Sequence, residues 1–240
     1  MDLGALAGFG VRAIDPAVAG TTAVSGVLLE SRLDEIADAL AGDGLIVLDG
    51  VLPPPLVDGL RCRVRGLADD RAMRPAGIGR GEEHQRAESV RTDEILWLTQ
   101  ENAVEAAYLD VMDTVRSGLN QRLFLGLFDY ECHFAVYAEG AYYRRHLDAF
   151  RGQRNRVVTT VFYLNEDWLG ADGGDLLIYD VDAAELAAPR QVVAPLGGRL
   201  VVFLSHRFPH EVLPARRRRY SIAGWFRLND SDSRRVDPAR

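Results

Sequence analysis

The second half of the chain reads as a succession of short strands, and this pattern constrains the fold more than any other feature. After Leu123, segments rich in β-branched and aromatic residues are separated by turn residues such as Glu139-Gly140 and Gly197-Gly198. The predicted strands lie near residues 131–137, 142–148, 156–164, 174–179, 191–194, 199–204 and 218–227. Such regular spacing is typical of a β-sandwich or a β-barrel.

The first half predicts helices that would support this sheet. Apolar residues recur at helical spacing after Ser31, after Pro53 and over roughly residues 101–119. Residues 70–90 form a polar, glycine-containing loop, and a loop this long inside a compact domain is usually functional or disordered. Helices first and strands afterwards predict an α+β fold in which N-terminal helices brace one side of the sheet.

Length and composition fit one large domain with short extensions. The chain has 240 residues, of which 48% are hydrophobic and 26% charged, as in ordinary globular proteins. We predict an N-terminal extension over residues 1–27, a single domain over 28–228 and a polar tail over 229–240. Within the domain, residues 28–122 would give mainly helical support and residues 123–228 the strand-rich core.

Charge and residue usage exclude some classes of partner. The net charge of −7 argues against a general nucleic-acid binder. No apolar run reaches the roughly 18 residues that a membrane-spanning helix needs, and the N-terminus lacks the features of a signal peptide. The two cysteines make no disulfide framework, so we expect a reducing compartment and a cytoplasmic protein. The oligomeric state stays open.

Three residues in the strand-rich half suggest a metal site. His146 and Asp148 are two residues apart near a predicted strand, so their side chains would share one face. Such a pair is also common as a hydrogen-bonded surface pair, but His210 follows a later strand and changes this interpretation. Two imidazoles and one carboxylate form the facial triad typical of non-heme Fe(II) oxygenases. A structural zinc site would normally need a closed set of four ligands, often with cysteine.

The strand after His210 predicts an anion pocket. Arg219, Ser221 and Ala223 would share one face, which places a cation beside two small side chains. This arrangement suits a planar carboxylate held by two hydrogen bonds. We interpret residues 216–218, which are also arginines, as a solvated basic patch.

These residues and their spacing resemble the iron(II)/2-oxoglutarate dioxygenases, specifically the prolyl 4-hydroxylase group closest to the hypoxia-factor prolyl hydroxylases. The pattern of that family is His-x-Asp, a distant His and an Arg nine residues later, and it is matched by His146, Asp148, His210 and Arg219. The resemblance covers roughly residues 89–227 and is weak before residue 70. It implies a double-stranded β-helix, a cupin-like jelly roll, for the C-terminal half.

The resemblance also implies a role for each matching residue. His146, Asp148 and His210 would bind Fe(II), and Arg219 would hold the distal carboxylate of 2-oxoglutarate. Tyr163 would share that carboxylate through its hydroxyl group. A second pocket tyrosine would be Tyr137, although the loop after it is one residue shorter here than in the family. Each tyrosine has an alternative interpretation as a core aromatic residue with a satisfied hydroxyl.

Three further residues match the mouth of the substrate pocket in that family. They are Arg91, Asp93 and Arg156, and we predict an ion pair between Asp93 and Arg156. An ordinary surface pair is the alternative. The loop over residues 70–90 corresponds to the family's mobile lid over its peptide substrate, although its sequence does not match well.

The implied chemistry is oxidative. Fe(II), 2-oxoglutarate and O₂ would together hydroxylate an unactivated C–H bond, with release of succinate and CO₂ and with ascorbate as a candidate reductant. The long polar lid suits a protein or peptide, so our leading hypothesis is a prolyl hydroxylase whose single catalytic domain spans residues 28–228. Three alternatives stay open, namely a hydroxylase of a free amino acid or small metabolite, a non-catalytic iron-binding sensor module and a zinc-dependent hydrolase.

Overall fold

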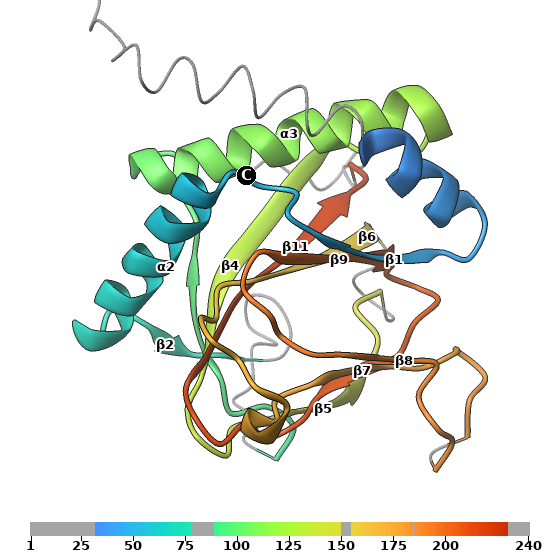
Figure 1. The fold of residues 1–240 in the computed structure, drawn as a ribbon. Coiled ribbons are helices and arrows are strands. Elements are labelled where there is room, and N and C mark those ends of the chain that lie inside the picture. Colours follow the sequence, from blue (N-terminus) through green and yellow to red (C-terminus); the bar gives the residue numbers. More distant parts are fainter. Residues whose placement is uncertain (1–31, 78–88, 150–154, 185, 230–240) are drawn as a thin grey trace, which may run out of the picture.

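Two antiparallel sheets face each other in the computed structural model, which describes residues 32–77, 89–149, 155–184 and 186–229 (Figure 1). The larger sheet contains β1 (Leu45–Asp49), β2 (Arg74–Pro75), β3 (Glu94–Trp97), β4 (Asp129–Tyr137), β6 (Arg156–Tyr163), β9 (Arg199–Leu204) and β11 (Arg219–Arg227). The smaller sheet contains β5 (Tyr143–His146), β7 (Leu176–Ile178), β8 (Gln191–Val193) and β10 (His210–Val212). Their spatial orders are β1-β9-β6-β11-β4-β3-β2 and β5-β10-β7-β8.

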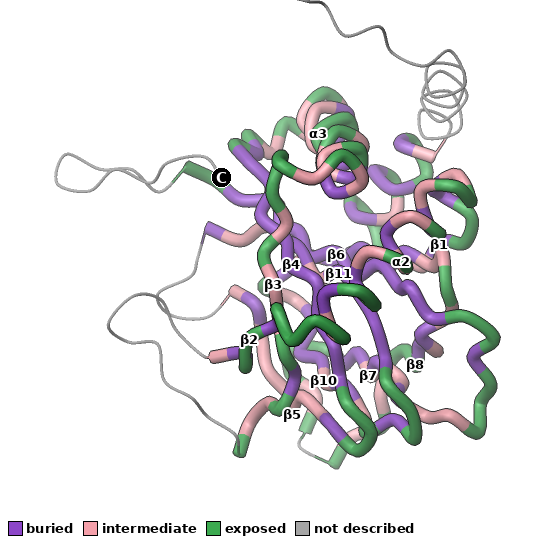
Figure 2. Tube along the Cα trace, turned by 90° about the vertical axis from the view of Figure 1, so that its left-hand side faces the viewer, coloured by how far each residue is buried: buried purple, intermediate pink, exposed green. Residues whose placement is uncertain are grey.

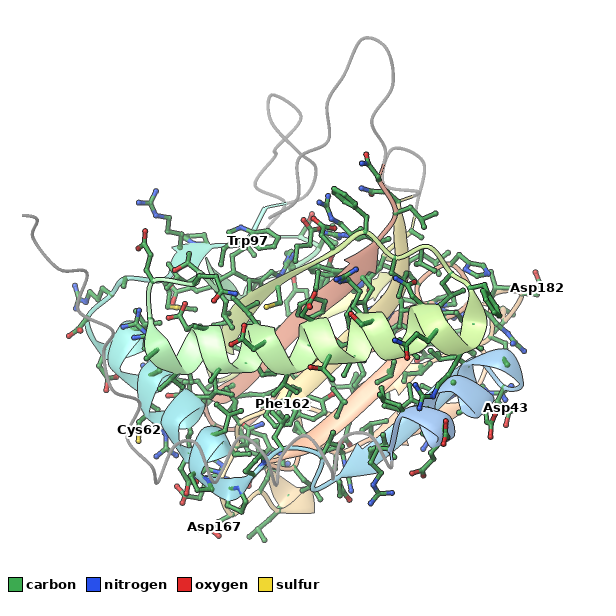
Figure 3. All side chains as sticks on the ribbon, turned by 90° about the horizontal axis from the view of Figure 1, so that it is seen from above. Asp43, Cys62, Trp97, Phe162, Asp167 and Asp182 are labelled. Carbon is green, nitrogen blue, oxygen red and sulfur yellow. The ribbon has the colours of Figure 1, made fainter. Side chains whose placement is uncertain are left out.

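Helices cover the outer face of the larger sheet, as the sequence predicts. A helix over residues 32–41 is followed by α2 (Pro54–Asp69) and α3 (Ala103–Leu123). The side chain of Asn102 caps α3 by accepting hydrogen bonds from the backbone N–H groups of Val104 and Glu105. In Figure 3, α3 crosses the strands of the sheet with Phe162 beneath it. None of the helices that the structure describes is long and apolar enough to cross a membrane.

The alternating pattern of β11 connects the core to the site. Tyr220, Ile222 and Phe226 join the hydrophobic core between the helices and the larger sheet. Arg219 and Ser221 lie on the opposite face, between the two sheets, as predicted. The strand lies between β4 and β6, and buried residues dominate all three strands (Figure 2). The polar residues of this inner face are therefore held on a central strand that is paired on both sides.

Two local predictions were wrong. The strand predicted over residues 142–148 ends at His146, and Asp148 lies in a bend after it. His210, expected in a connection, begins the short strand β10. Hydrogen bonding along β10 pairs it with β5 on one side and β7 on the other, and a three-residue strand is too short to show an alternating pattern in sequence. The predicted extension over residues 1–27, the tail after Asn229 and most of the predicted lid lie outside the described residues.

Gly224 in β11 supports a prediction about stability. A Cβ atom there would overlap the hydroxyl group of Tyr130, which is held by a 2.8 Å hydrogen bond to Thr160. We expect Gly224→Ala to lower the free energy of unfolding by about 2 kcal/mol, as overpacking of a core does, in a chemical denaturation experiment. Gly66→Ala is the control, because Gly66 lies in α2 with open space around it and should gain roughly 0.5–1 kcal/mol from helix propensity. Equal stability of Gly224→Ala and the wild type would contradict this packing.

Candidate active site

Three side chains from the smaller sheet and the bend after it converge on one point. One ligand atom from each of His146, Asp148 and His210 lies within 4.8 Å of the others. Nε2 of His146 is 3.6 Å from Oδ1 of Asp148, and Nε2 of His210 is 3.5 Å from Oδ2. The convergence arises because His146 and His210 are direct partners in the register of β5 and β10. Throughout the described part of the chain, no other group of three potential metal ligands has this spacing.

Each of the three side chains is oriented by a hydrogen bond to a group outside the cluster. Nδ1–H of His146 donates to the carbonyl of Arg144 at 2.8 Å, and Nδ1–H of His210 donates to the carbonyl of Phe208 at 3.0 Å. Because a carbonyl oxygen can only accept, the proton is fixed on Nδ1 and the lone pair of Nε2 faces the centre. The hydroxyl group of Thr159 donates to Oδ2 of Asp148 at 2.8 Å and sets the plane of the carboxylate.

The local electrostatics give these groups the protonation states that a cation needs. Burial acts to raise the pKa of Asp148, but the imidazoles of His210 and His146 outweigh it, and the pKa lies well below its usual range. Burial lowers the pKa of His210 to about 4. The site therefore offers a carboxylate and a neutral imidazole at neutral pH, the forms in which these side chains bind metal ions.

A second polar group lies on the larger sheet, on the face that packs against the smaller sheet. Arg219 is 1% exposed, and its Nε donates to the carbonyl of Gly174 at 3.0 Å. Its Nη2 and the hydroxyl group of Tyr163 are buried, and neither has a hydrogen-bond partner among the described residues. The rings of Tyr137 and Tyr163 flank the guanidinium carbon at 4.9 and 5.0 Å. No carboxylate among the described residues pairs with this guanidinium, and a buried cation without a counter-charge is costly, so the arrangement favours a bound anion.

The predicted ion pair between Asp93 and Arg156 does not form. Asp93 instead accepts two hydrogen bonds from Arg91, at 2.7 and 2.6 Å, and Arg156 donates to Glu131 at 3.0 and 2.8 Å. Arg91 and Asp93 are two residues apart in extended chain, so their side chains meet on one face with little loss of conformational freedom. Glu131 lies opposite Trp225 in the sheet, and the guanidinium of Arg156 covers the Trp225 ring at 3.6 Å.

Three residues near the centre were not assigned from the sequence. Thr159 orients Asp148, Glu131 pairs with Arg156, and Tyr143 stacks on His146. A glutamate inside the mostly apolar strand β4 was a usable signal, since a buried carboxylate needs a cation. The role of Tyr143 had no such signal, because residues three apart in a regular strand point to opposite faces.

Comparison with known proteins decides the family. The sequence model of the 2OG-Fe(II) oxygenase superfamily matches residues 132–227. A Pseudomonas putida prolyl-4-hydroxylase of known structure is 43% identical, with 82% of this chain and 98% of that chain covered and a TM-score of 0.70. The chain belongs to the 2OG-Fe(II) oxygenase superfamily. Its predicted resemblance to prolyl hydroxylases and its jelly-roll fold are confirmed.

Two further relatives extend the comparison. A prolyl hydroxylase from Trichoplax adhaerens, solved with a peptide fragment of the hypoxia inducible factor oxygen degradation domain, is 25% identical with a TM-score of 0.70. That likeness covers 90% of this chain and 94% of the Trichoplax chain. Human Egl nine homolog 1 is 30% identical over 216 residues, which are 86% of this chain. The chain spans about half the length, 48%, of this human relative.

The residues present fit both groups named in the family description. Two imidazoles and a carboxylate that converge on one point are the donor set that Fe(II) takes in such oxygenases. The two unpartnered donors, Nη2 of Arg219 and the hydroxyl of Tyr163, match the acceptors of a carboxylate, which 2-oxoglutarate carries at both ends. The family uses Fe(II), 2-oxoglutarate and O₂, and this cavity has donors for the first two.

Proposed function

We propose that the chain is an Fe(II)/2-oxoglutarate-dependent dioxygenase that hydroxylates a prolyl residue of a protein or peptide. The reaction would convert 2-oxoglutarate and O₂ into succinate and CO₂. One observation carries the proposal, namely the buried Arg219 and Tyr163 with unpartnered donor groups, which lie between the same two sheets as the His–Asp–His cluster. The printed names of the Pseudomonas and Trichoplax relatives support prolyl hydroxylation, and the peptide bound to the second supports a peptide substrate.

The proposed mechanism gives each side chain one task. Nε2 of His146, Nε2 of His210 and the carboxylate of Asp148 would hold the iron from one side and leave its other positions open. When bound, the iron supplies the activation of O₂ that is coupled to decarboxylation of 2-oxoglutarate and to oxidation of the C–H bond. Arg219 and Tyr163 would bind the distal carboxylate and orient the co-substrate, and Tyr137 would close that side of the pocket and exclude water.

The substrate contacts, the cellular location and the reductant are finer parts of the proposal. We propose that the wall formed by Arg156, Glu131 and Trp225 contacts the substrate at the mouth of the cavity. A cytoplasmic location is supported by the free thiols of Cys62 and Cys132, which fit a reducing compartment. Ascorbate is proposed as the reductant on the family resemblance alone.

Gly174 tests the proposed role of Arg219. Gly174 has φ +73, and an added Cβ would lie 2.9 Å from Cβ of Ala215 and 3.2 Å from Cδ of Arg219. We expect Gly174→Ala to displace the guanidinium and to raise KM for 2-oxoglutarate roughly tenfold to a hundredfold, as small misplacements of a binding group do, in steady-state kinetics. Gly50→Ala is the control, since Gly50 has φ +68 with open space around it and shares the backbone strain alone. An equal change of KM in both variants would contradict the role.

The reaction is tested by mass spectrometry. Purified protein with Fe(II) and 2-oxoglutarate is incubated with peptides from a digested cell lysate and, separately, with free L-proline, while succinate is measured. We expect prolyl residues of some peptides to gain one oxygen atom, with matching succinate, and Asp148→Ala to give neither product. Oxidation of free L-proline alone would favour the metabolite hydroxylase. Metal binding without succinate in either reaction would favour the non-catalytic sensor module.

A further inference from the structure

The imidazole of His146 is one layer of a stack of side chains. The ring of Tyr143 lies against it with centroids 3.6 Å apart and planes 13° from parallel. The ring of His210 also contacts it, with centroids 4.3 Å apart and planes tilted by 55°. The imidazole therefore has little room to turn about its Cβ–Cγ bond.

An irregularity in the smaller sheet makes this stack possible. His210 pairs with His146 and Val212 pairs with Tyr143, so two steps along β10 match three steps along β5. The extra residue in β5 lets Tyr143 and His146 point to the same face, which a regular strand would forbid. The irregularity thus places the ring of Tyr143 directly against His146, a proposed metal ligand.

Arg91 holds the other face of Tyr143. Its guanidinium carbon lies 4.3 Å from the Tyr143 ring centroid, within the range of a cation–π contact. The guanidinium is itself fixed by the carboxylate of Asp93, whose side chain is 0% exposed. The backbone adds a bridge between Arg91 and Tyr143, and N–H of Arg144 donates to the carbonyl of Val90 at 2.8 Å. The layers thus run in order from Asp93 through Arg91 and Tyr143 to His146.

His146 needs this support more than His210 does. His210 is on β10, which has neighbours on both sides, and its ring meets Phe203 at 4.9 Å. His146 ends β5, the edge strand of the smaller sheet, and its side chain is 16% exposed against 7% for His210. The hydrogen bond from Nδ1 fixes one atom of the His146 ring, and the stack fixes the plane of the ring.

We infer that Tyr143, backed by Arg91 and Asp93, is a positioning residue that fixes the plane of His146 so that Nε2 faces the metal site before the ion binds. The inference rests on the proposed function, because it takes His146 as a ligand of the iron. In this inference Arg91 and Asp93 support a metal ligand, whereas the resemblance had placed them at the mouth of the substrate pocket. Their effect on catalysis would pass through Tyr143.

Cobalt binding to the metal-free protein tests this inference without turnover. Co²⁺ is titrated into the wild type, Tyr143→Leu and the conservative variant Tyr143→Phe, and the visible absorption of the bound ion is recorded. We expect Tyr143→Leu to bind Co²⁺ roughly tenfold more weakly, within the 10–100-fold range known for groups that orient metal ligands, and to show an altered spectrum at saturation. Tyr143→Phe keeps the ring and should match the wild type in both affinity and spectrum.

The outcomes separate this inference from the proposed function. Unchanged affinity and spectrum in a folded Tyr143→Leu, even with a lower melting temperature, would overturn the inference and leave the ligand assignment intact. Wild-type binding of Co²⁺ no tighter than in His146→Ala would overturn the proposed function itself. If Tyr143→Leu does not fold, the double variant Arg91→Gln with Asp93→Asn carries the test, because it removes both charges at similar size. Weaker Co²⁺ binding by that variant is expected, and wild-type binding would reject the inference.

Discussion

Asp148→Ala is expected to lose both the metal ion and turnover. The carboxylate is buried, faces both Nε2 atoms at 3.5–3.6 Å and supplies the anionic member of the donor set. Two neutral imidazoles alone would leave Fe(II) without charge compensation in a buried site. We therefore expect a loss of iron affinity beyond the ~10–100-fold that changes around the ligands cause, and no detectable succinate. Equilibrium dialysis with iron analysis and a succinate assay measure the two effects.

A matched control separates this effect from a general loss of acidic charge. Asp180 is exposed and pairs with Arg190 at 3.1 Å. Asp180→Ala removes the same charge outside the cavity, so it should keep wild-type iron content and succinate formation. Wild-type succinate formation by Asp148→Ala would remove Asp148 from the ligand set.

Arg219→Leu is expected to act on the co-substrate and to spare the metal. The substitution keeps the bulk of the side chain and removes the cation proposed to bind the distal carboxylate. Loss of one partner of a buried charge pair costs about 2–5 kcal/mol, so KM for 2-oxoglutarate should rise by at least about thirtyfold. Iron affinity should stay at the wild-type level, because Arg219 lies on β11 of the larger sheet and is not part of the His–Asp–His cluster.

The same variant also tests how 2-oxoglutarate changes the melting temperature. In the protein without co-substrate, Nη2 of Arg219 is buried and has no partner among the described residues. Leucine removes this cost together with the hydrogen bond from Nε to the carbonyl of Gly174, so the two effects on the melting temperature without 2-oxoglutarate oppose each other. The stabilisation by added 2-oxoglutarate should disappear. Arg218→Leu is the control, since Arg218 is exposed and pairs with Asp69. A wild-type KM in Arg219→Leu would show that the carboxylate binds elsewhere.

The sequence predicted the parts of the fold that depend on local patterns. The alternation in β11 separated the buried Arg219 from the exposed arginines at positions 216–218, as the structure confirms. The family pattern matched by His146, Asp148 and His210 predicted that these side chains would lie together, and their ligand atoms do lie within 4.8 Å of one another. Turn glycines marked the strand boundaries to within a few residues.

Features that depend on the register between strands escaped the prediction. The pairing of Arg156 with Glu131 requires that β4 and β6 flank Trp225 in β11, which the order and the register of the strands decide together. The contact of Tyr143 with His146 requires the irregularity between β5 and β10. The predicted partner of Asp93 was wrong for a different reason. Asp93 pairs with Arg91, two residues away, through two hydrogen bonds, and not with the distant Arg156.

A crystal structure of the protein grown with Fe(II) under anaerobic conditions tests the central claim most directly. Anomalous scattering at the iron edge locates the ion independently of the protein coordinates. We predict a single strong peak bonded to Nε2 of His146, Nε2 of His210 and a carboxylate oxygen of Asp148, with the cavity toward Arg219 open to 2-oxoglutarate. Iron located elsewhere, or these three side chains without iron at saturating Fe(II), would contradict it.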